Sequence, residues 1–152
     1  MRKILISGAS RGIGKAIALK LLKDGHSISL GVRKKASLIN TPLDPKLHNK
    51  ENLFVHTYEA TDISSSKIWV QNTIKTFKSI DTIIHCAGIF KRTSLIFDDN
   101  EIKDIENLWK VNLMGPWILT KDAWKYLSMN KSARIIVLVS MSGKRSKGNL
   151  AS

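Results

Sequence analysis

The sequence predicts an α/β fold in which helices cover both faces of a doubly wound parallel sheet. Apolar runs of strand length alternate along the chain with segments whose apolar residues recur at helical spacing, and the connections are short. A glycine-rich turn joins the first apolar run to the first helical segment. Elements that alternate in this way form parallel sheets through right-handed crossovers. We therefore expect residues 1–152 to form a single domain, since this length can enclose one hydrophobic core.

Each predicted strand is a short segment with several apolar residues, and each predicted helix carries apolar residues at helical spacing. The expected strands are residues 3–7, 27–32, 53–58, 81–86 and 134–140. The expected helices are residues 12–23, 64–77, 100–109 and 112–127. Gly25 follows the first helix at the usual C-terminal position, and Ser64 to Ser66 are candidate caps for the second. Residues 34–51 have poor periodicity and contain two prolines, so a short helix and an irregular loop both stay open.

The composition indicates a globular protein with a strongly basic surface. Apolar residues make up 43% of the chain and charged residues 24%, and the formal net charge is +13. The basic residues are spread along the chain and form no like-charged block. We interpret most of them as solvated surface residues, with an anionic cofactor or substrate as the next explanation. Nucleic-acid binding is the least supported of the three, because it rests on charge alone.

Apolar run lengths and cysteine content bear on location. No apolar run approaches the length of a membrane span, and the run from Ile4 to Ile6 is too short for a signal peptide. Cys86 is the single cysteine, so no internal disulfide can form. We therefore expect no membrane segment and a cytoplasmic location.

A glycine-rich turn with the spacing Gly-x-x-x-Gly-x-Gly follows the first predicted strand and opens the first predicted helix. Gly8 lets the chain turn sharply, Gly12 lets the backbone approach a pyrophosphate, and Gly14 lets the helix pack close to the strand. The free N–H groups at the helix start then face the phosphates. The expected dinucleotide site comprises Gly8, Ser10, Arg11, Gly12, Ile13 and Gly14.

This glycine spacing resembles that of the short-chain dehydrogenase/reductase family, and the resemblance extends over the whole chain. It implies a Rossmann-like fold, a nicotinamide cofactor and hydride transfer that reduces a carbonyl or oxidises an alcohol. The cofactor supplies the hydride chemistry, whereas the protein supplies a proton and orients the substrate. The expected partner is therefore a small-molecule carbonyl compound or alcohol. Its identity does not follow from the fold.

The residues after the second predicted strand favour NADP(H) over NAD(H). Sites that prefer NAD usually place an acidic residue about 20 positions past the glycines, where it binds the ribose 2′-hydroxyl. Here that region contains Arg33, Lys34 and Lys35 and no carboxylate. A guanidinium binds a phosphate through two hydrogen bonds, and Arg11 can reach the same region. In the family a basic residue here accompanies NADP; the alternative for Arg33 is a solvated residue after a strand.

The resemblance also implies an acidic residue against the adenine, after the third strand. Glu59 and Asp62 both suit this position, and both are kept as candidates. The alternative for Asp62 is a cap on the following helix.

After the fourth strand the family usually has Asn-Asn-Ala-Gly, where this sequence has His85-Cys86-Ala87-Gly88. Ala87 and Gly88 match, and Gly88 would let the backbone approach the nicotinamide ribose. His85 and Cys86 depart from the pattern. We interpret His85 as a packed or hydrogen-bonded residue and Cys86 as a core thiol.

Two polar residues match catalytic positions of the family. Val111-Asn112-Leu113 resembles the segment whose Asn supports the proton relay, so Asn112 is the relay candidate; its alternative is a helix N-cap or a mid-helix polar residue. The fifth predicted strand leads to Ser140, the candidate that polarises the substrate oxygen, with Ser142 as second choice. The alternative for Ser140 is a turn serine at a strand end.

The proton-donating Tyr-x-x-x-Lys element of the family does not occur in the 152 residues. Its Tyr would fall just beyond Ser152, and neither Tyr58 nor Tyr126 can replace it. We therefore expect a sheet that stops after its fifth strand, an incomplete C-terminal side and no turnover by this chain as written. The alternative function, from a different class of protein, is that of a non-catalytic dinucleotide-binding module.

The predicted helix 112–127 carries two apolar stripes. One contains Leu113, Trp117, Trp124 and Leu127, and the other contains Met114 and Ile118. A helix that is apolar on two sides packs between two bodies. The second stripe therefore suggests either a homo-oligomer, as the resemblance implies, or packing against a further helix of the same chain.

Overall fold

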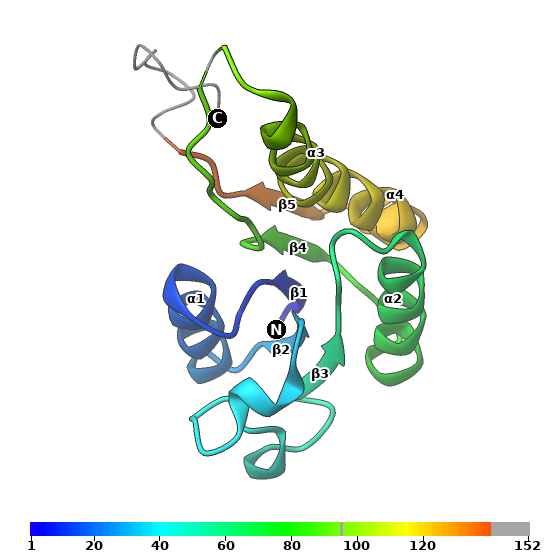
Figure 1. Ribbon diagram of the computed structural model, residues 1–152. Coiled ribbons are helices and arrows are strands. Elements are labelled where there is room, and N and C mark those ends of the chain that lie inside the picture. Colours follow the sequence, from blue (N-terminus) through cyan, green and yellow to red (C-terminus); the bar gives the residue numbers. More distant parts are fainter. Residues whose placement is uncertain (95, 141–152) are drawn as a thin grey trace.

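Five parallel strands form one sheet at the centre of the molecule (Figure 1). The computed structural model describes residues 1–94 and 96–140. The strands are β1 (Lys3–Ser7), β2 (Ser27–Val32), β3 (Leu53–Thr57), β4 (Thr82–His85) and β5 (Arg134–Val137). Their order is β3–β2–β1–β4–β5. From β1 the strands β2 and β3 follow toward one edge, and β4 and β5 lie toward the other, so the strand order reverses between β1 and β4. The predicted strands agree to within one residue at each end, except that the fifth ends before Leu138 and does not reach Ser140.

Helices cover both faces of the sheet (Figure 1). They are α1 (Gly12–Lys23) on one face, and α2 (Ile63–Phe77) and α4 (Gly115–Ser128) on the other. Successive residues of a strand point to opposite faces, so each buried strand contributes to two cores. In β1, Ile4 and Ile6 belong to the core under α1, whereas Leu5 belongs to the core under α2 and α4. This arrangement confirms the predicted doubly wound α/β fold.

The segment between β2 and β3 combines both structures that its sequence left open. It contains two short 3₁₀ turns, Lys35–Leu38 and Pro45–Leu47, within an otherwise irregular loop. Leu38 and Leu43 are fully buried and belong to the core under α1. The Asp44 carboxylate accepts a hydrogen bond from Lys46 N at 3.0 Å and so caps the second turn. The loop is therefore anchored by apolar side chains at a few positions, which helical periodicity does not detect.

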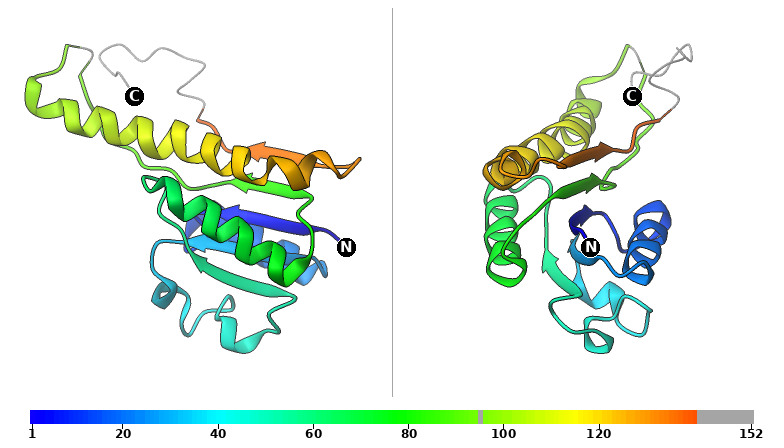
Figure 2. Two further views of the ribbon diagram at one scale, coloured as in Figure 1. Left: turned by 90° about the vertical axis from the view of Figure 1, so that its right-hand side faces the viewer. Right: turned by 180° about the vertical axis from the view of Figure 1, so that it is seen from behind.

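The helices predicted at residues 100–109 and 112–127 are one continuous helical segment. It begins as a 3₁₀ turn (Asp99–Glu101), continues as α3 (Ile102–Trp109), passes through a π-helical turn (Lys110–Met114) and ends as α4. A π turn pairs residues five apart and shifts the apolar positions that follow it, without ending the helix. The sequence pattern therefore looks like two helices. Figure 2 shows the segment extending past the sheet at its α3 end.

The sheet covers neither of the two apolar stripes predicted for residues 112–127, and only Leu127 among their members is buried. The residues that the helix buries are Val111, Gly115, Leu119, Ala123 and Leu127. The exposed members of the two predicted stripes are Leu113, Met114, Trp117 and Trp124. Close packing explains the difference, because a Cβ atom at Gly115 would lie 2.9 Å from the Cβ of Ala60. Small side chains fit this contact, and the tryptophans are placed on the outer side of the helix.

Strand β5 is the edge of the sheet within the part of the chain that the structure describes. Ile135 and Ile136 are each 42% exposed, although the two side chains point to opposite faces. The strands β1, β2 and β4 are buried on both faces. In the described ranges, no helix is long and apolar enough to cross a bilayer.

Candidate functional site

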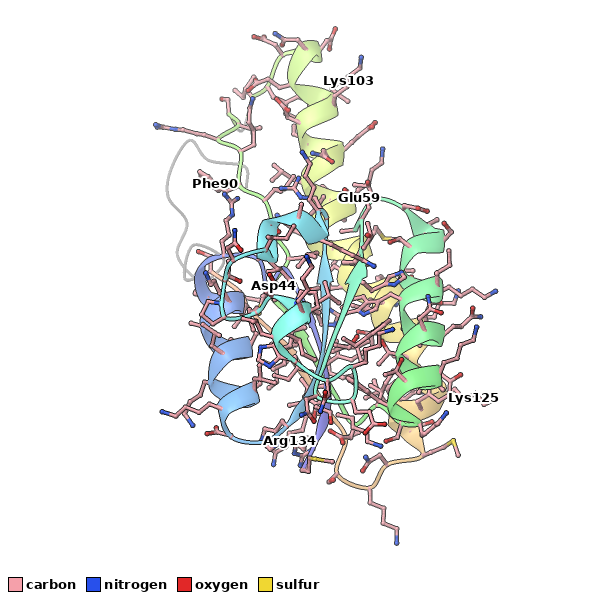
Figure 3. The ribbon with its side chains drawn as sticks, turned by 90° about the horizontal axis from the view of Figure 1, so that it is seen from below. Asp44, Glu59, Phe90, Lys103, Lys125 and Arg134 are labelled. Atoms are coloured by element: carbon pink, nitrogen blue, oxygen red, sulfur yellow. The ribbon has the colours of Figure 1, made fainter. Side chains whose placement is uncertain are left out.

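A cleft of about 360 Å³ opens at the carboxyl ends of the strands. Ligands of doubly wound sheets bind at these ends, where the strand order reverses. The predicted cofactor residues that line it are Gly8, Ser10, Arg11, Gly12, Ile13, Gly14, Arg33, Glu59, Ala87 and Gly88. Figure 3 shows Glu59 at the end of the sheet opposite to Arg134, the first residue of β5. The structure therefore brings together ten candidates that the sequence distributes over four separate segments.

The glycine turn is held tightly between β1, β2 and the residues after β4. Gly8 has a φ of 73°, a backbone conformation that favours glycine, and its N–H donates to Gly31 O at 3.0 Å. A Cβ atom at Gly14 would lie 2.5 Å from the carbonyl oxygen of Gly8. These contacts agree with the roles inferred for Gly8 as a turn residue and for Gly14 as the site of close helix packing.

The N-terminus of α1 opens into the same cleft. Its first amide groups belong to Gly12, Ile13 and Gly14, all of which line the cleft, and the first N–H groups of a helix have no partner within the helix. No acidic residue occurs in the first turn, and Arg11 occupies the N-cap without a side-chain capping bond. No atom lies within 4 Å of an ideal Cβ at Gly12. The helix start is therefore an open, positively polarised cradle that suits a pyrophosphate.

Two arginines line the cleft. Arg33 follows β2 directly, and Arg11 comes from the glycine turn; both residues are exposed and line the cleft. The ion pairs found in residues 1–94 and 96–140 involve neither arginine. Both cations are thus available to an anionic ligand.

Glu59 and Asp62 have different structural roles. Glu59 lines the cleft, and its backbone N–H donates to Ser65 Oγ at 2.9 Å. Asp62 caps α2 instead, because its Oδ1 accepts from Ser64 N at 2.9 Å and from Ser64 Oγ at 2.7 Å. These hydrogen bonds hold the pKa of Asp62 below its ordinary value. The structure therefore leaves Glu59 as the acidic residue of the cleft.

The chain after β4 forms the wall of the cleft opposite the glycine turn. Cys86 N donates to Ser7 O at 3.2 Å, and Ala87 N donates to Ser7 Oγ at 3.2 Å, which ties this wall to β1. Cys86 is half-buried, and burial raises the pKa of its thiol. Its Cβ lies 3.0 Å from where a Cβ of Gly14 would be, so a larger residue here would press on the glycine turn.

Asn112 lies within the π turn and binds the chain that leaves β4. Its Oδ1 accepts from Ile89 N at 2.9 Å, and its Nδ2 donates to Ile89 O at 2.8 Å. It is therefore not a helix N-cap; it is a polar residue within the helical segment, and its side chain binds the chain after β4 through both polar atoms. Its neighbours Val111 and Ile89 line the cleft.

Ser140 lies beyond the end of β5 and is exposed. Leu138, two residues earlier, lines the cleft, so this segment approaches the site from β5. Ser142, the second choice, lies outside the described residues.

Tyr58 is a cleft residue that sequence reasoning did not identify. It follows β3, lines the cleft, is 4% exposed and donates a hydrogen bond from its hydroxyl to Gly115 O at 3.3 Å. Burial raises its pKa further above the ordinary value. Its position next to Glu59 was the available signal. An anchored, buried phenol of this kind is unsuited to donate a proton to a substrate.

The fold and this cleft define a doubly wound α/β domain of the dinucleotide-binding class. A sequence profile of the family described as short chain dehydrogenase matches residues 2–152. The chain belongs to this family.

Similar proteins include two reductases. The agropine synthesis reductase of Rhizobium rhizogenes is 35% identical over 142 residues, which cover 93% of this chain and 32% of that protein. The 3-ketodihydrosphingosine reductase of Bos taurus is 26% identical over 145 residues, which cover 93% of this chain and 43% of that protein. The chain thus spans less than half the length of these relatives.

Solved structures show the same fold. An alcohol dehydrogenase from the archaeon Thermococcus sibiricus, complexed with 5-hydroxy-NADP, is 25% identical with a TM-score of 0.84, over 98% of this chain and 62% of that one. A short-chain dehydrogenase from Streptomyces avermitilis is 18% identical with a TM-score of 0.86, over 97% of this chain and 52% of that one.

Proposed function

We propose that this chain forms the NADP(H)-binding part of an oxidoreductase that acts on a small carbonyl compound or alcohol. The observation that carries the proposal is the pair Arg11 and Arg33, which line one cleft and have no carboxylate partner within residues 1–94 and 96–140. A guanidinium pair stabilises a 2′-phosphate, whereas NAD offers only a hydroxyl there. The NADP analogue named with the Thermococcus sibiricus relative is consistent with this choice.

Residues of the cleft can be assigned to each part of the proposed cofactor. The α1 start would hold the pyrophosphate through N–H groups at Gly12 and Ile13, and Glu59 would face the adenine. Ala87 and Gly88 would hold the nicotinamide ribose. When bound, the nicotinamide supplies a hydride donor or acceptor. The protein contributes the binding energy and the orientation.

The catalytic part of the proposal assigns two residues. Asn112 orients the chain at Ile89 next to the nicotinamide end, and Ser140 would contact the substrate oxygen. A general acid typically contributes about 10²–10⁴ in rate, and the family's Tyr-x-x-x-Lys is not among these 152 residues. Tyr58 cannot act as the general acid, because its hydroxyl is buried and donates a hydrogen bond to Gly115 O. We therefore propose that this chain binds cofactor but does not turn over substrate by itself.

The test is a fluorescence titration of the purified chain with NADPH and, separately, with NADH. Arg33→Ala is expected to weaken NADPH binding by about 10-fold to 100-fold, because a charge-assisted hydrogen bond contributes about 1.5–3 kcal/mol, and to leave NADH binding nearly unchanged. Arg134→Ala is the matched control, since this exposed arginine lies at the opposite end of the sheet (Figure 3). Equal affinity for NADPH and NADH in the wild-type chain would refute the proposal. Circular dichroism must show that each variant is folded.

A further inference from the structure

His85, the last residue of β4, binds helix α4 through its imidazole. Its Nε2 lies 2.9 Å from Oγ1 of Thr120, and the residue is 2% exposed. Burial lowers the pKa of His85 to about 4, so the ring is neutral near pH 7. A neutral imidazole has one donor nitrogen and one acceptor nitrogen, and Thr120 satisfies one of the two.

Packing alone does not account for a histidine at this position. Within the described part of the chain, Nδ1 of His85 is buried and has no hydrogen-bond partner. A buried unpaired polar atom is unfavourable, and an aliphatic side chain of similar size would avoid it. The bond to Thr120 is therefore the property that distinguishes His85 from an apolar residue at the same place.

A second contact joins the same chain segment to the same helical segment. Further along from His85, the backbone of Ile89 is bound through both its N–H and its C=O by the side chain of Asn112. Asn112 and Thr120 belong to one continuous helical segment. These two contacts join the helical segment to β4 and to the chain that leaves it, at points eight residues apart on the helix.

His85 also contacts the segment that leads to Ser140. Its carbonyl oxygen accepts a hydrogen bond from Leu138 N at 3.1 Å, and its Cα is paired with that of Val137 in β5. Leu138 lines the cleft two residues before Ser140. His85 thus connects, through its side chain and its backbone, the two elements that carry the proposed catalytic residues.

We propose that His85 is a positioning residue that acts through Thr120 to hold Asn112 against Ile89 beside the cleft. The proposal rests on the proposed function for the significance of Asn112. Its test uses no cofactor, so a failure of cofactor binding and a failure of this proposal are separate results.

The experiment measures amide hydrogen exchange by NMR in the intact chain. The reporter is Ile89 N–H, which donates to Asn112, and the internal reference for global opening is Ile6 N–H in central strand β1. Thr120→Val removes the hydroxyl at nearly constant volume, and His85→Leu removes the imidazole. Two conservative variants test for rescue: Thr120→Ser keeps the hydroxyl, and His85→Gln keeps a polar group of similar reach.

Ser66→Ala is the matched control. The Ser66 hydroxyl donates to the Asp122 carboxylate, so it joins the same helix α4 to α2 and does not involve β4. Its removal tests whether any lost contact of α4 would disturb Ile89.

The expected result is that Thr120→Val and His85→Leu each speed Ile89 exchange about fivefold or more relative to Ile6. Thr120→Ser and His85→Gln should restore most of the protection, and Ser66→Ala should leave the ratio of the two rates unchanged. Two results would overturn the proposal. One is an unchanged ratio in a folded Thr120→Val variant, and the other is an equal change in the Ser66→Ala control.

Discussion

The side chain of Asn112 binds the backbone of Ile89 at both of its polar atoms, accepting from the N–H at 2.9 Å and donating to the C=O at 2.8 Å. Both ends of the amide are therefore engaged before any ligand arrives. This geometry makes Asn112 an orienting residue for the chain that leaves β4. We propose that this orientation is the contribution of Asn112 to the site.

Replacement of Asn112 should loosen the β4 exit and leave the sheet intact. Asn112→Leu keeps the approximate volume but removes two hydrogen bonds at an exposed position, so we expect the unfolding free energy to fall by roughly 1–2 kcal/mol. Limited proteolysis should become faster near Ile89, and urea denaturation measures the change in unfolding free energy. An unchanged cleavage rate at this segment would contradict the orienting role. Asn72→Leu, on α2, is a control for the substitution itself.

Two glycines of the cofactor turn should respond differently to alanine. A Cβ at Gly14 would meet the Gly8 carbonyl oxygen at 2.5 Å, and backbone cannot move aside easily, so Gly14→Ala should destabilise the fold by about 1–3 kcal/mol. Gly12→Ala meets no atom within 4 Å, and its φ of 57° gives strain of about 1–2 kcal/mol. Its main effect should be weaker NADPH binding, because the methyl group occupies the phosphate cradle. Urea denaturation and NADPH titration separate the two effects, and normal NADPH affinity in Gly12→Ala would disprove the cradle.

Gly31 and Trp69 should behave as a coupled pair. A Cβ at Gly31 would lie 2.6 Å from two atoms of the six-membered ring of Trp69, which is fully buried. Gly31→Ala alone should therefore be destabilising by about 1–3 kcal/mol. Trp69→Phe makes room but loses the bond from Nε1 to Ser29 Oγ. The double variant should lose less stability than the sum of the single ones, and strict additivity in a thermal-denaturation cycle would show that the ring does not contact Gly31.

Acid should weaken the fold through His85. Its pKa is about 4 in the folded chain and 6.5 as the ordinary value, so folding favours the neutral ring. The resulting stability is fully present above pH 6.5 and is lost as pH falls from 6.5 through 4; the total is up to roughly 3 kcal/mol. Burial also lowers the pKa of His56, so the measurement is the difference between wild type and His85→Gln. If the unfolding free energies of the two proteins change with pH in parallel over this range, the lowered pKa of His85 is refuted.

The sequence predicted the sheet well because strand burial is a local signal. The apolar run Ile4–Ile6 of β1 is buried on both faces, and its limits are visible in the residues themselves. The same holds for the glycine turn, whose spacing is a backbone requirement. These features depend on residues that are close together in the chain, so they can be predicted without a structure.

Features that depend on the three-dimensional arrangement of the residues were not predictable in the same way. Whether Asp62 faces a ligand or caps a helix depends on the geometry of Ser64, and both roles suit an aspartate at that point of the sequence. The buried side of α4 depends on how closely Gly115 approaches Ala60, which apolar periodicity does not encode. The π turn at Asn112 is stabilised by contacts with the chain after β4, so the sequence alone indicated two helices.

The place of β1 in the sheet has a consequence for folding kinetics. β1 is the first strand of the chain, yet it lies at the centre, between β2 and β4. Its β2 side can close over a short loop, as in the contact between Arg2 and His26, 24 residues apart. Its β4 side requires contacts such as Lys3 with Asp81, 78 residues apart, and longer loops close more slowly and at greater entropic cost. The cleft lies across this junction, so the ability to bind a dinucleotide should be acquired late, in the step that joins the two halves of the sheet.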